Sequence, residues 1–190
     1  MSQIIRIDEE SFSSSIEHFS FSIDHDQIVT MDDLRNLRLF SKLESASFCA
    51  TNLDDVGLEH VSRVPTLENL DLQYTKITDD GLACLQHLPG LKYLRLKENA
   101  QLTNACIPHL LRLNALVELQ IHETSIDQHG LDRLEGLKNL RHIVLDVWEG
   151  NYSFDALLAL STRMPACTIL AKGDGEFFQG RFDGVWTAER

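Results

Sequence analysis

The chain of 190 residues is poor in basic and aromatic residues and contains no long apolar run. Its 17 Lys and Arg are outnumbered by 29 Asp and Glu, which gives a formal net charge of −12. A surface of that charge repels the phosphates of nucleic acids and of anionic membranes, so we expect neither as a partner. No apolar stretch approaches the roughly 20 residues of a transmembrane helix. The first residues are acidic where a signal peptide would be basic, so we expect a cytoplasmic protein.

Motifs that carry chemistry are also absent. The four cysteines are Cys49, Cys84, Cys106 and Cys167. Because none of them forms a C-x-x-C pair, we predict buried free thiols rather than a zinc or redox site. There is no G-x-S-x-G, P-loop, H-E-x-x-H or dinucleotide-binding signature. Asp24, His25 and Asp26 are better interpreted as a polar turn, since three adjacent residues cannot easily face one metal ion. We therefore predict no enzyme activity, no catalytic residue, no metal site and no cofactor.

What the sequence does contain is leucine at regular spacing. The pattern L-x-x-L-x-L recurs every 24 or 25 residues, with copies that begin at Leu43, Leu67, Leu91, Leu116 and Leu140. A weaker copy begins at Ile16. Threonine recurs in a second column, with Asn99 in the matching place of one copy; its members are Thr51, Thr75 and Thr124. A fixed period in this range is typical of solenoids, in which each unit buries its apolar face only against its neighbours.

Each unit combines a short strand with a short helix. Leu70 and Leu72 alternate with polar residues, which predicts a strand with one apolar face. Thr78 is a suitable N-cap for a following helix, and Pro89 ends that helix. The apolar positions of the helix step by three residues, through Leu82, Leu85 and Leu88.

The complete unit is LxxLxLxxTxITDxGLxxLxxLPx, as it stands from Leu67 to Gly90. It resembles the leucine-rich repeat family, in the class with a short helix on the convex side. The resemblance implies an α/β solenoid with a parallel concave sheet and short convex helices. We expect residues 1–42 to form an N-terminal cap and a degenerate first repeat, residues 43–166 the repeats, and residues 167–190 a C-terminal cap or tail.

Both ends of the array need a cap. At the N-terminus we expect the apolar residues Ile4, Ile5, Ile7, Ile16, Phe19, Phe21 and Ile23 to supply it. The C-terminal segment is rich in glycine and aromatic residues, from Gly173 to Trp186. Two interpretations of that segment stay open: a folded cap over the last repeat, and an aromatic segment that engages a partner.

Alternation along the strands also predicts the residues that face away from the core on one continuous surface. We predict that this surface binds a partner through Asn69, Asp71, Gln73, Tyr93, Arg95, Lys97, Glu118, Gln120, His122, His142, Asp146 and Trp148. Its residues differ from copy to copy, with a basic and aromatic centre flanked by acids. Charge pairing of Asp71 with Arg95 and of Arg95 with Glu118 is the structural alternative, and both can hold. Trp148 either extends this surface or covers the exposed end of the core.

These features together predict a non-catalytic protein-binding module. One hypothesis is an immunity-type inhibitor that binds and neutralises a toxin or effector through its concave face. The alternative is an adaptor or substrate-recruiting protein. In either case we expect the partner to be another protein with a basic or mixed-charge surface, and the free chain to be a monomer.

Overall fold

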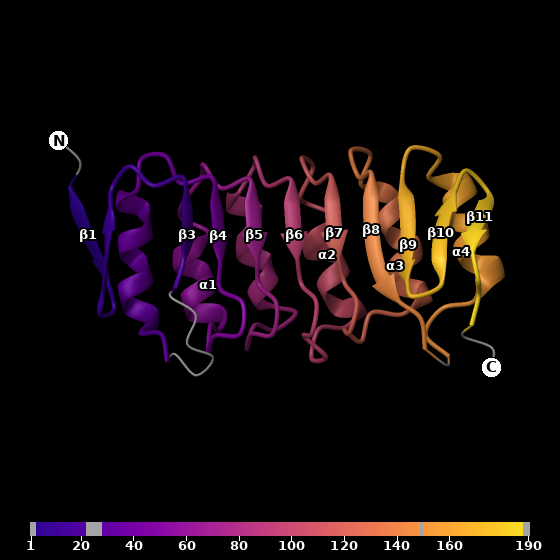
Figure 1. Cartoon of the computed structure of the whole chain (residues 1–190), viewed down its shortest axis with the longest axis horizontal. Helices are drawn as coiled ribbons and strands as arrows, with labels where there is room; N and C mark the ends of the chain where they lie inside the picture. The colour runs from indigo at the N-terminus through magenta and orange to yellow at the C-terminus, as the bar shows by residue number, and fades with distance from the viewer. Residues whose placement is uncertain (1–2, 22–27, 149, 188–190) are drawn as a thin grey trace.

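Nine strands form one sheet along the molecule, in the order β11-β10-β9-β8-β7-β6-β5-β4-β3. The structure is a computed structural model that describes residues 3–21, 28–148 and 150–187. The termini lie at opposite ends of the array (Figure 1). The parallel strands are β3 (His18–Ser20), β4 (Ser45–Ser47), β5 (Asn69–Asp71), β6 (Tyr93–Arg95), β7 (Glu118–Gln120), β8 (His142–Asp146) and β9 (Thr168–Lys172). The predicted polar turn at Asp24–Asp26 and the cap residue Ile23 lie outside the described residues.

The register of the sheet follows from the repeat. The central residues of successive strands are paired in the series Phe19, Ala46, Leu70, Leu94, Leu119, Ile143 and Ile169. All of them are buried. Because each unit puts an apolar residue at the same height, the side chains of neighbouring units form one continuous core. The predicted α/β leucine-rich-repeat solenoid, with a mostly parallel sheet and short helices, is confirmed.

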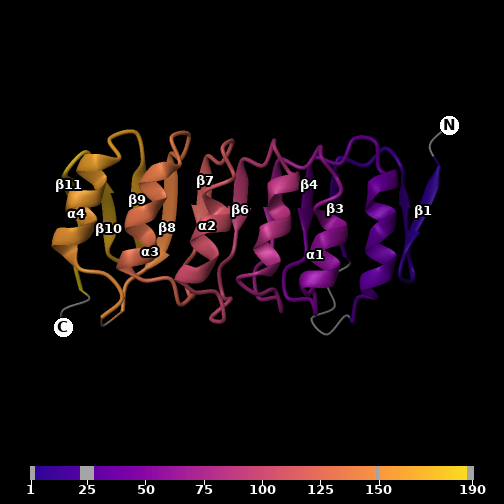
Figure 2. The same ribbon diagram turned by 180° about the vertical axis from the view of Figure 1, so that it is seen from behind.

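The helices all lie on one side of the sheet, as Figure 2 shows from behind. They are η1 (Met31–Leu39), α1 (Asp55–Val61), η2 (Gly81–His87), η3 (Asn104–Cys106), α2 (Ile107–Leu110), α3 (Gln128–Arg133), η4 (Leu134–Gly136) and α4 (Phe154–Arg163). Four of these eight are 3₁₀ helices, which advance further per residue than an α-helix and suit a short span. Among the residues that the structure describes, no helix lies on the other side of the sheet, which we call the open side.

A separate antiparallel hairpin stands at the N-terminal end. It consists of β1 (Ile4–Ile7) and β2 (Glu10–Ser13). Ile5 and Ile7 are buried, and the ring of Phe12 lies 5.0 Å from that of Phe19. Ile4 was expected in the cap but is 64% exposed, because alternate residues of a strand point to opposite sides.

The C-terminal segment is folded against the last helix. β10 (Gly175–Phe178) and β11 (Arg181–Gly184) continue the sheet in antiparallel fashion. Phe177 is fully buried, and its ring lies 5.3 Å from that of Phe154 and 4.6 Å from that of Phe182. This arrangement corresponds to the folded-cap interpretation of the segment.

The threonine column connects each turn to the end of the preceding strand by a hydrogen bond. Each member donates a hydrogen bond to the carbonyl three residues earlier: Thr51 to Phe48 at 2.8 Å, Thr75 to Leu72 at 3.0 Å, Asn99 to Leu96 at 3.0 Å and Thr124 to Ile121 at 2.6 Å. Asn99 also reaches the preceding repeat, where its Oδ1 accepts a hydrogen bond from the Thr75 N–H at 3.0 Å. It therefore links two repeats as well as its own turn.

A second ladder connects the beginnings of the helices. Asp55 accepts hydrogen bonds from the N–H and the hydroxyl of Thr78, at 2.8 and 2.7 Å. Asp79 holds Thr103 in the same way, at 2.8 and 2.7 Å. Asp127 is the N-cap of α3, and its partner in the preceding repeat is Asn104. The Asn104 Nδ2 donates to Asp127 Oδ1 at 2.6 Å. An aspartate at position 104 would place two carboxylates next to each other, where they would repel. The amide of Asn104 can instead donate to the Asp127 carboxylate.

Candidate protein-binding face

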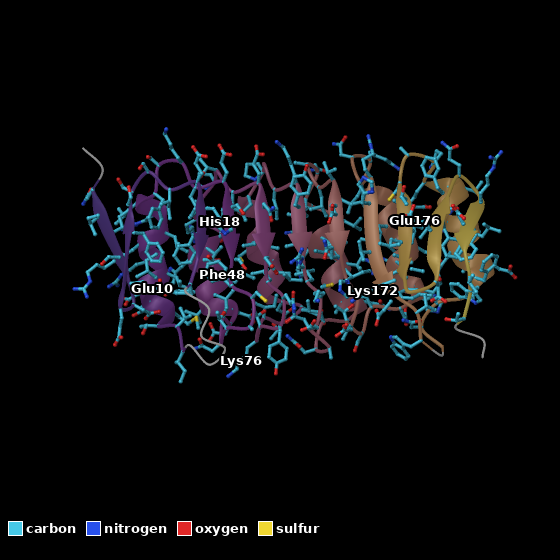
Figure 3. The ribbon with its side chains drawn as sticks, viewed as in Figure 1. Glu10, His18, Phe48, Lys76, Lys172 and Glu176 are labelled. Atoms are coloured by element: carbon cyan, nitrogen blue, oxygen red, sulfur yellow. The ribbon has the colours of Figure 1, made fainter. Side chains whose placement is uncertain are left out.

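The open sheet face comprises the side chains that leave the parallel strands on the side away from the helices (Figure 3). Its first row is His18, Ser45, Asn69, Tyr93, Glu118, His142 and Thr168. Its second row is Ser20, Ser47, Asp71, Arg95, Gln120, Val144 and Leu170. Seven of the predicted partner-binding residues lie in these rows. The structure brings them together because corresponding positions of successive repeats are hydrogen-bonded neighbours, about 4.8 Å apart.

A polar network crosses the middle of the face. Arg95 Nη1 lies 3.1 Å from Asp71 Oδ2, which forms the expected pair across two strands. The second expected pair is not formed: Arg95 Nε donates to Gln120 Oε1 at 3.1 Å instead of reaching Glu118. The register explains this difference, because Gln120 is the residue level with Arg95, whereas Glu118 is level with Tyr93. Gln120 in turn donates to Glu118 Oε1 at 2.7 Å.

Next to this network the face is hollowed. The hollow has a volume of about 350 Å³ and extends from β3 to β7. On one side it is lined by β4, whose short side chains on this face are those of Ser45 and Ser47. On the other side stand the larger Tyr93 and Arg95 of β6. The hollow therefore follows from the unequal side-chain size of neighbouring repeats, while the backbone repeats regularly beneath it.

A third row of side chains follows the two rows just beyond the strand ends, and Gln73 and Lys97 belong to it. Lys97 Nζ lies 2.9 Å from Glu98 Oε1, and Gln73 Nε2 donates to the same oxygen at 3.1 Å. These two contacts hold the pKa of the Glu98 carboxyl below its usual value. Glu98 was not among the predicted residues. Its backbone is left-handed (φ 59°), as it is at Ala50, Tyr74 and Glu123 in the matching positions, and these residues share no type that marks the position in the sequence.

His122 is placed differently from the expectation that it faces a partner. Its side chain is almost fully buried, with 4% of the residue exposed. Burial, together with Lys172 and Lys97, lowers the pKa of its imidazole below the usual value, so it is neutral near pH 7. Asp146, at the end of β8, accepts a hydrogen bond from the N–H of Glu123 at 2.8 Å. His122 thus has little surface to offer a partner, and Asp146 also fixes a turn.

The C-terminal edge of the face carries two aromatic residues with different positions. Trp148 is 52% exposed. Tyr152 is buried, and its hydroxyl donates to the carbonyl of Ile126 at 2.6 Å. Desolvation raises the pKa of the Tyr152 hydroxyl, with smaller contributions from Asp146 and Asp127. Tyr152 is therefore part of the core, whereas Trp148 is available at the edge of the open sheet face.

The prediction of buried thiols is correct for three cysteines and wrong for the fourth. Cys84, Cys106 and Cys167 are buried, whereas Cys49 is exposed beside the hollow's strands. Cys49 occupies the third row, where side chains point away from the core. Partial burial and the nearby carboxylate of Asp71 raise the pKa of its thiol. A raised pKa lowers the fraction of reactive thiolate at neutral pH.

Among residues 3–21, 28–148 and 150–187 there is no group of three His, Cys, Asp or Glu that could hold a metal ion. Within the same ranges, no helix has both the length and the apolar character needed to cross a bilayer.

Comparison with known proteins gives one informative sequence match. No family model matches the chain. Over 70 residues, the chain is 43% identical to a Drosophila melanogaster protein named distal membrane arm assembly component 2. The match covers 35% of this chain and 25% of that protein. The matched segment thus spans about a third of this chain and about a quarter of that relative.

Solved structures with similar folds are repeat proteins of low sequence identity. An internalin from Listeria monocytogenes has a TM-score of 0.46 at 15% identity, over 74% of this chain and 49% of that one. A leucine-rich-repeat protein from Leptospira interrogans has a TM-score of 0.47 at 19% identity, over 71% of this chain and 38% of that one. Similarities at this level transfer no function.

Proposed function

We propose that this chain is a non-catalytic adaptor that holds another protein on its open sheet face during assembly of a larger complex. One observation carries the proposal: a regular backbone displays a row of side chains that changes from repeat to repeat and is hollowed between β4 and β6. The regular backbone of the solenoid does not require such variety. Shape and polarity that vary along one face are what recognition of a specific partner requires.

The Drosophila match favours the adaptor over the immunity-type inhibitor. The name of that protein describes a component that assembles a membrane arm. We therefore propose a partner that is a subunit of a membrane-associated complex. The immunity-type role has no comparable support and stays a prediction, as does the cytoplasmic location. The face residues Asn69, Asp71, Tyr93, Arg95, Glu118 and Gln120 are proposed as the centre of the contact, with Trp148 at its edge.

Capture of the partner from native cells tests this proposal. The tagged chain is incubated with soluble and detergent-solubilised fractions, and captured proteins are identified by mass spectrometry. The assay compares wild type with Tyr93→Ala and Arg95→Glu. We expect each variant to lower the affinity for the partner at least tenfold. Replacing an aromatic or arginine anchor at an interface costs about 2 kcal/mol or more of binding free energy. Arg112→Glu and Tyr74→Ala are matched controls, since both residues are exposed and lie outside the hollow.

The result also separates the two hypotheses. A subunit of a multi-subunit complex supports the adaptor, whereas a secreted effector domain supports the inhibitor. If both face variants retain full partner binding while their folding is unchanged by circular dichroism, the open sheet face is not the binding site. The folded C-terminal segment, with the 42% exposed Phe178, then becomes the better candidate.

A further inference from the structure

The hollow on the open sheet face has an unbalanced charge. Its lining includes two carboxylates, those of Asp71 and Glu118, and one guanidinium, that of Arg95. Asp71 is paired with Arg95. Glu118 receives only a hydrogen bond from the neutral Gln120 amide and forms no ion pair with any residue that the structure describes. One carboxylate charge in the hollow is thus uncompensated.

Tyr93 stands directly beside that carboxylate. It is level with Glu118 on the neighbouring strand, and 42% of it is exposed. Because adjacent strands of a sheet lie about 4.8 Å apart, the two side chains leave the sheet as immediate neighbours. An aromatic ring attracts a cation over its face, and a carboxylate attracts the same cation. Tyr93 and Glu118 therefore supply two attractions that act together on one positive group.

Arg95 does not make the hollow a site for an anion. Its Nε and Nη1 already donate to Gln120 and Asp71. Binding a carboxylate through the edge that carries Nε would break the existing network, and a second negative charge would approach Glu118. The remaining wall is formed by the hydroxyls of Ser45 and Ser47 and by Asn69. These groups can accept hydrogen bonds from an ammonium or guanidinium group.

The dimensions suit a side chain rather than a domain. A volume of about 350 Å³ is at the lower end of the roughly 300–1,000 Å³ typical of ligand sites. The overall charge of −12 draws a basic partner surface toward the chain. From these observations we propose that the hollow between β4 and β6 receives an arginine or lysine side chain of the protein partner, held between the Tyr93 ring and the Glu118 carboxylate. The inference rests on the proposed function, because it assigns the chemistry of the partner at that face.

Selection of peptides tests the chemistry without the native partner. The probe is a phage library of random twelve-residue peptides, selected on wild-type chain and depleted on the Tyr93→Ala/Glu118→Gln double variant. We expect the selected peptides to share one arginine or lysine. Replacing that residue by neutral citrulline or glutamine should weaken binding to wild type about fivefold or more, the range of a cation–π contact combined with an exposed ion pair. On Glu118→Gln the same replacement should have a smaller effect, as a double-mutant cycle requires.

Matched variants separate the ring and the charge from general damage. Tyr93→Phe keeps the ring and should keep binding within about twofold, whereas Tyr93→Ala should lose about fivefold. Glu44→Gln removes an exposed acid outside the hollow and should leave peptide affinity unchanged.

Selection of acidic or apolar peptides, selection of no peptide, or indifference to citrulline overturns this inference. Such a result leaves the proposed function standing if the native partner is still lost on Arg95→Glu. Conversely, full capture of the native partner by both face variants overturns the proposed function itself.

Discussion

Replacing Asn99 should destabilise the solenoid more than any replacement in the equivalent column of another repeat. The side chain is fully buried. Its Nδ2 donates to the carbonyls of Leu72 and Leu96, at 2.8 and 3.0 Å, and its Oδ1 accepts from the Thr75 N–H at 3.0 Å. In the described structure the side chains of Thr51 and Thr124 bond within their own turns, and the Thr75 hydroxyl reaches another repeat through Asn99 Oδ1 itself, at 3.3 Å. Asn99 therefore has additional contacts to lose.

The size of the effect follows from the groups left without a partner. In Asn99→Ala, the Thr75 N–H and the Leu96 carbonyl lose the one hydrogen bond that the described structure gives them. The Leu72 carbonyl keeps the Thr75 hydroxyl. Each buried group left unsatisfied costs about 1–3 kcal/mol, so we expect a loss of about 4 kcal/mol in the free energy of unfolding. Asn99→Thr restores the bond to Leu96 alone and should lose about 2 kcal/mol.

Urea denaturation followed by far-UV circular dichroism measures these differences. With a slope of about 2 kcal/mol per molar urea, Asn99→Ala should lower the midpoint by about 2 M and Asn99→Thr by about 1 M. Thr124→Val is the control, because it removes hydrogen bonds within one turn only, the one donated to the Ile121 carbonyl and the long one accepted from the Ile126 N–H. A loss below 1 kcal/mol for Asn99→Ala, or equal losses for Ala and Thr at this position, would refute the assignment of Asn99 as a link between repeats.

Three further predictions concern packing and thiol exposure. Gly81→Ala should lower the free energy of unfolding by about 1–3 kcal/mol, because its Cβ would clash with Asp55 Oδ1. The double variant Gly81→Ala/Asp55→Ala should lose less than the sum of the two single-variant losses in the same urea denaturation. Iodoacetamide should modify Cys49 before Cys106, because the Cys106 thiol is buried and desolvation raises its pKa to about 12. Peptide mass mapping with and without urea distinguishes this order from uniform labelling. Phe177→Ala should cost about 3–5 kcal/mol, and a thermal transition unchanged from wild type would show that the C-terminal segment does not cover the core.

Much of the fold could be predicted from the sequence because the information is local and repeated. Leu70 and Leu72 alternate with polar residues, and that alternation recurs in each unit. A fixed period forces equivalent residues to the same height, so the register between strands follows from the alignment. For the same reason, the face residues at Asn69, Asp71 and Tyr93 could be named before the structure was known.

The errors arose where residues from different repeats meet. The expected pair of Arg95 with Glu118 requires knowing which residue is level with which, and the observed register places Gln120 there instead. His122 was expected to be exposed, but the depth of a side chain just beyond a strand end depends on how the following turns close over it.

The sequence by itself determined the repeat, the side of each strand that is buried and the acidic character of the surface, because each depends on residue type and spacing alone. Only the tertiary structure decided that Asn99 joins two repeats, that Asp55 holds Thr78, and that a hollow opens beside Tyr93 with Glu118 unpaired. These features depend on contacts between residues about one repeat apart in the chain. Such contacts exist only once the units have stacked.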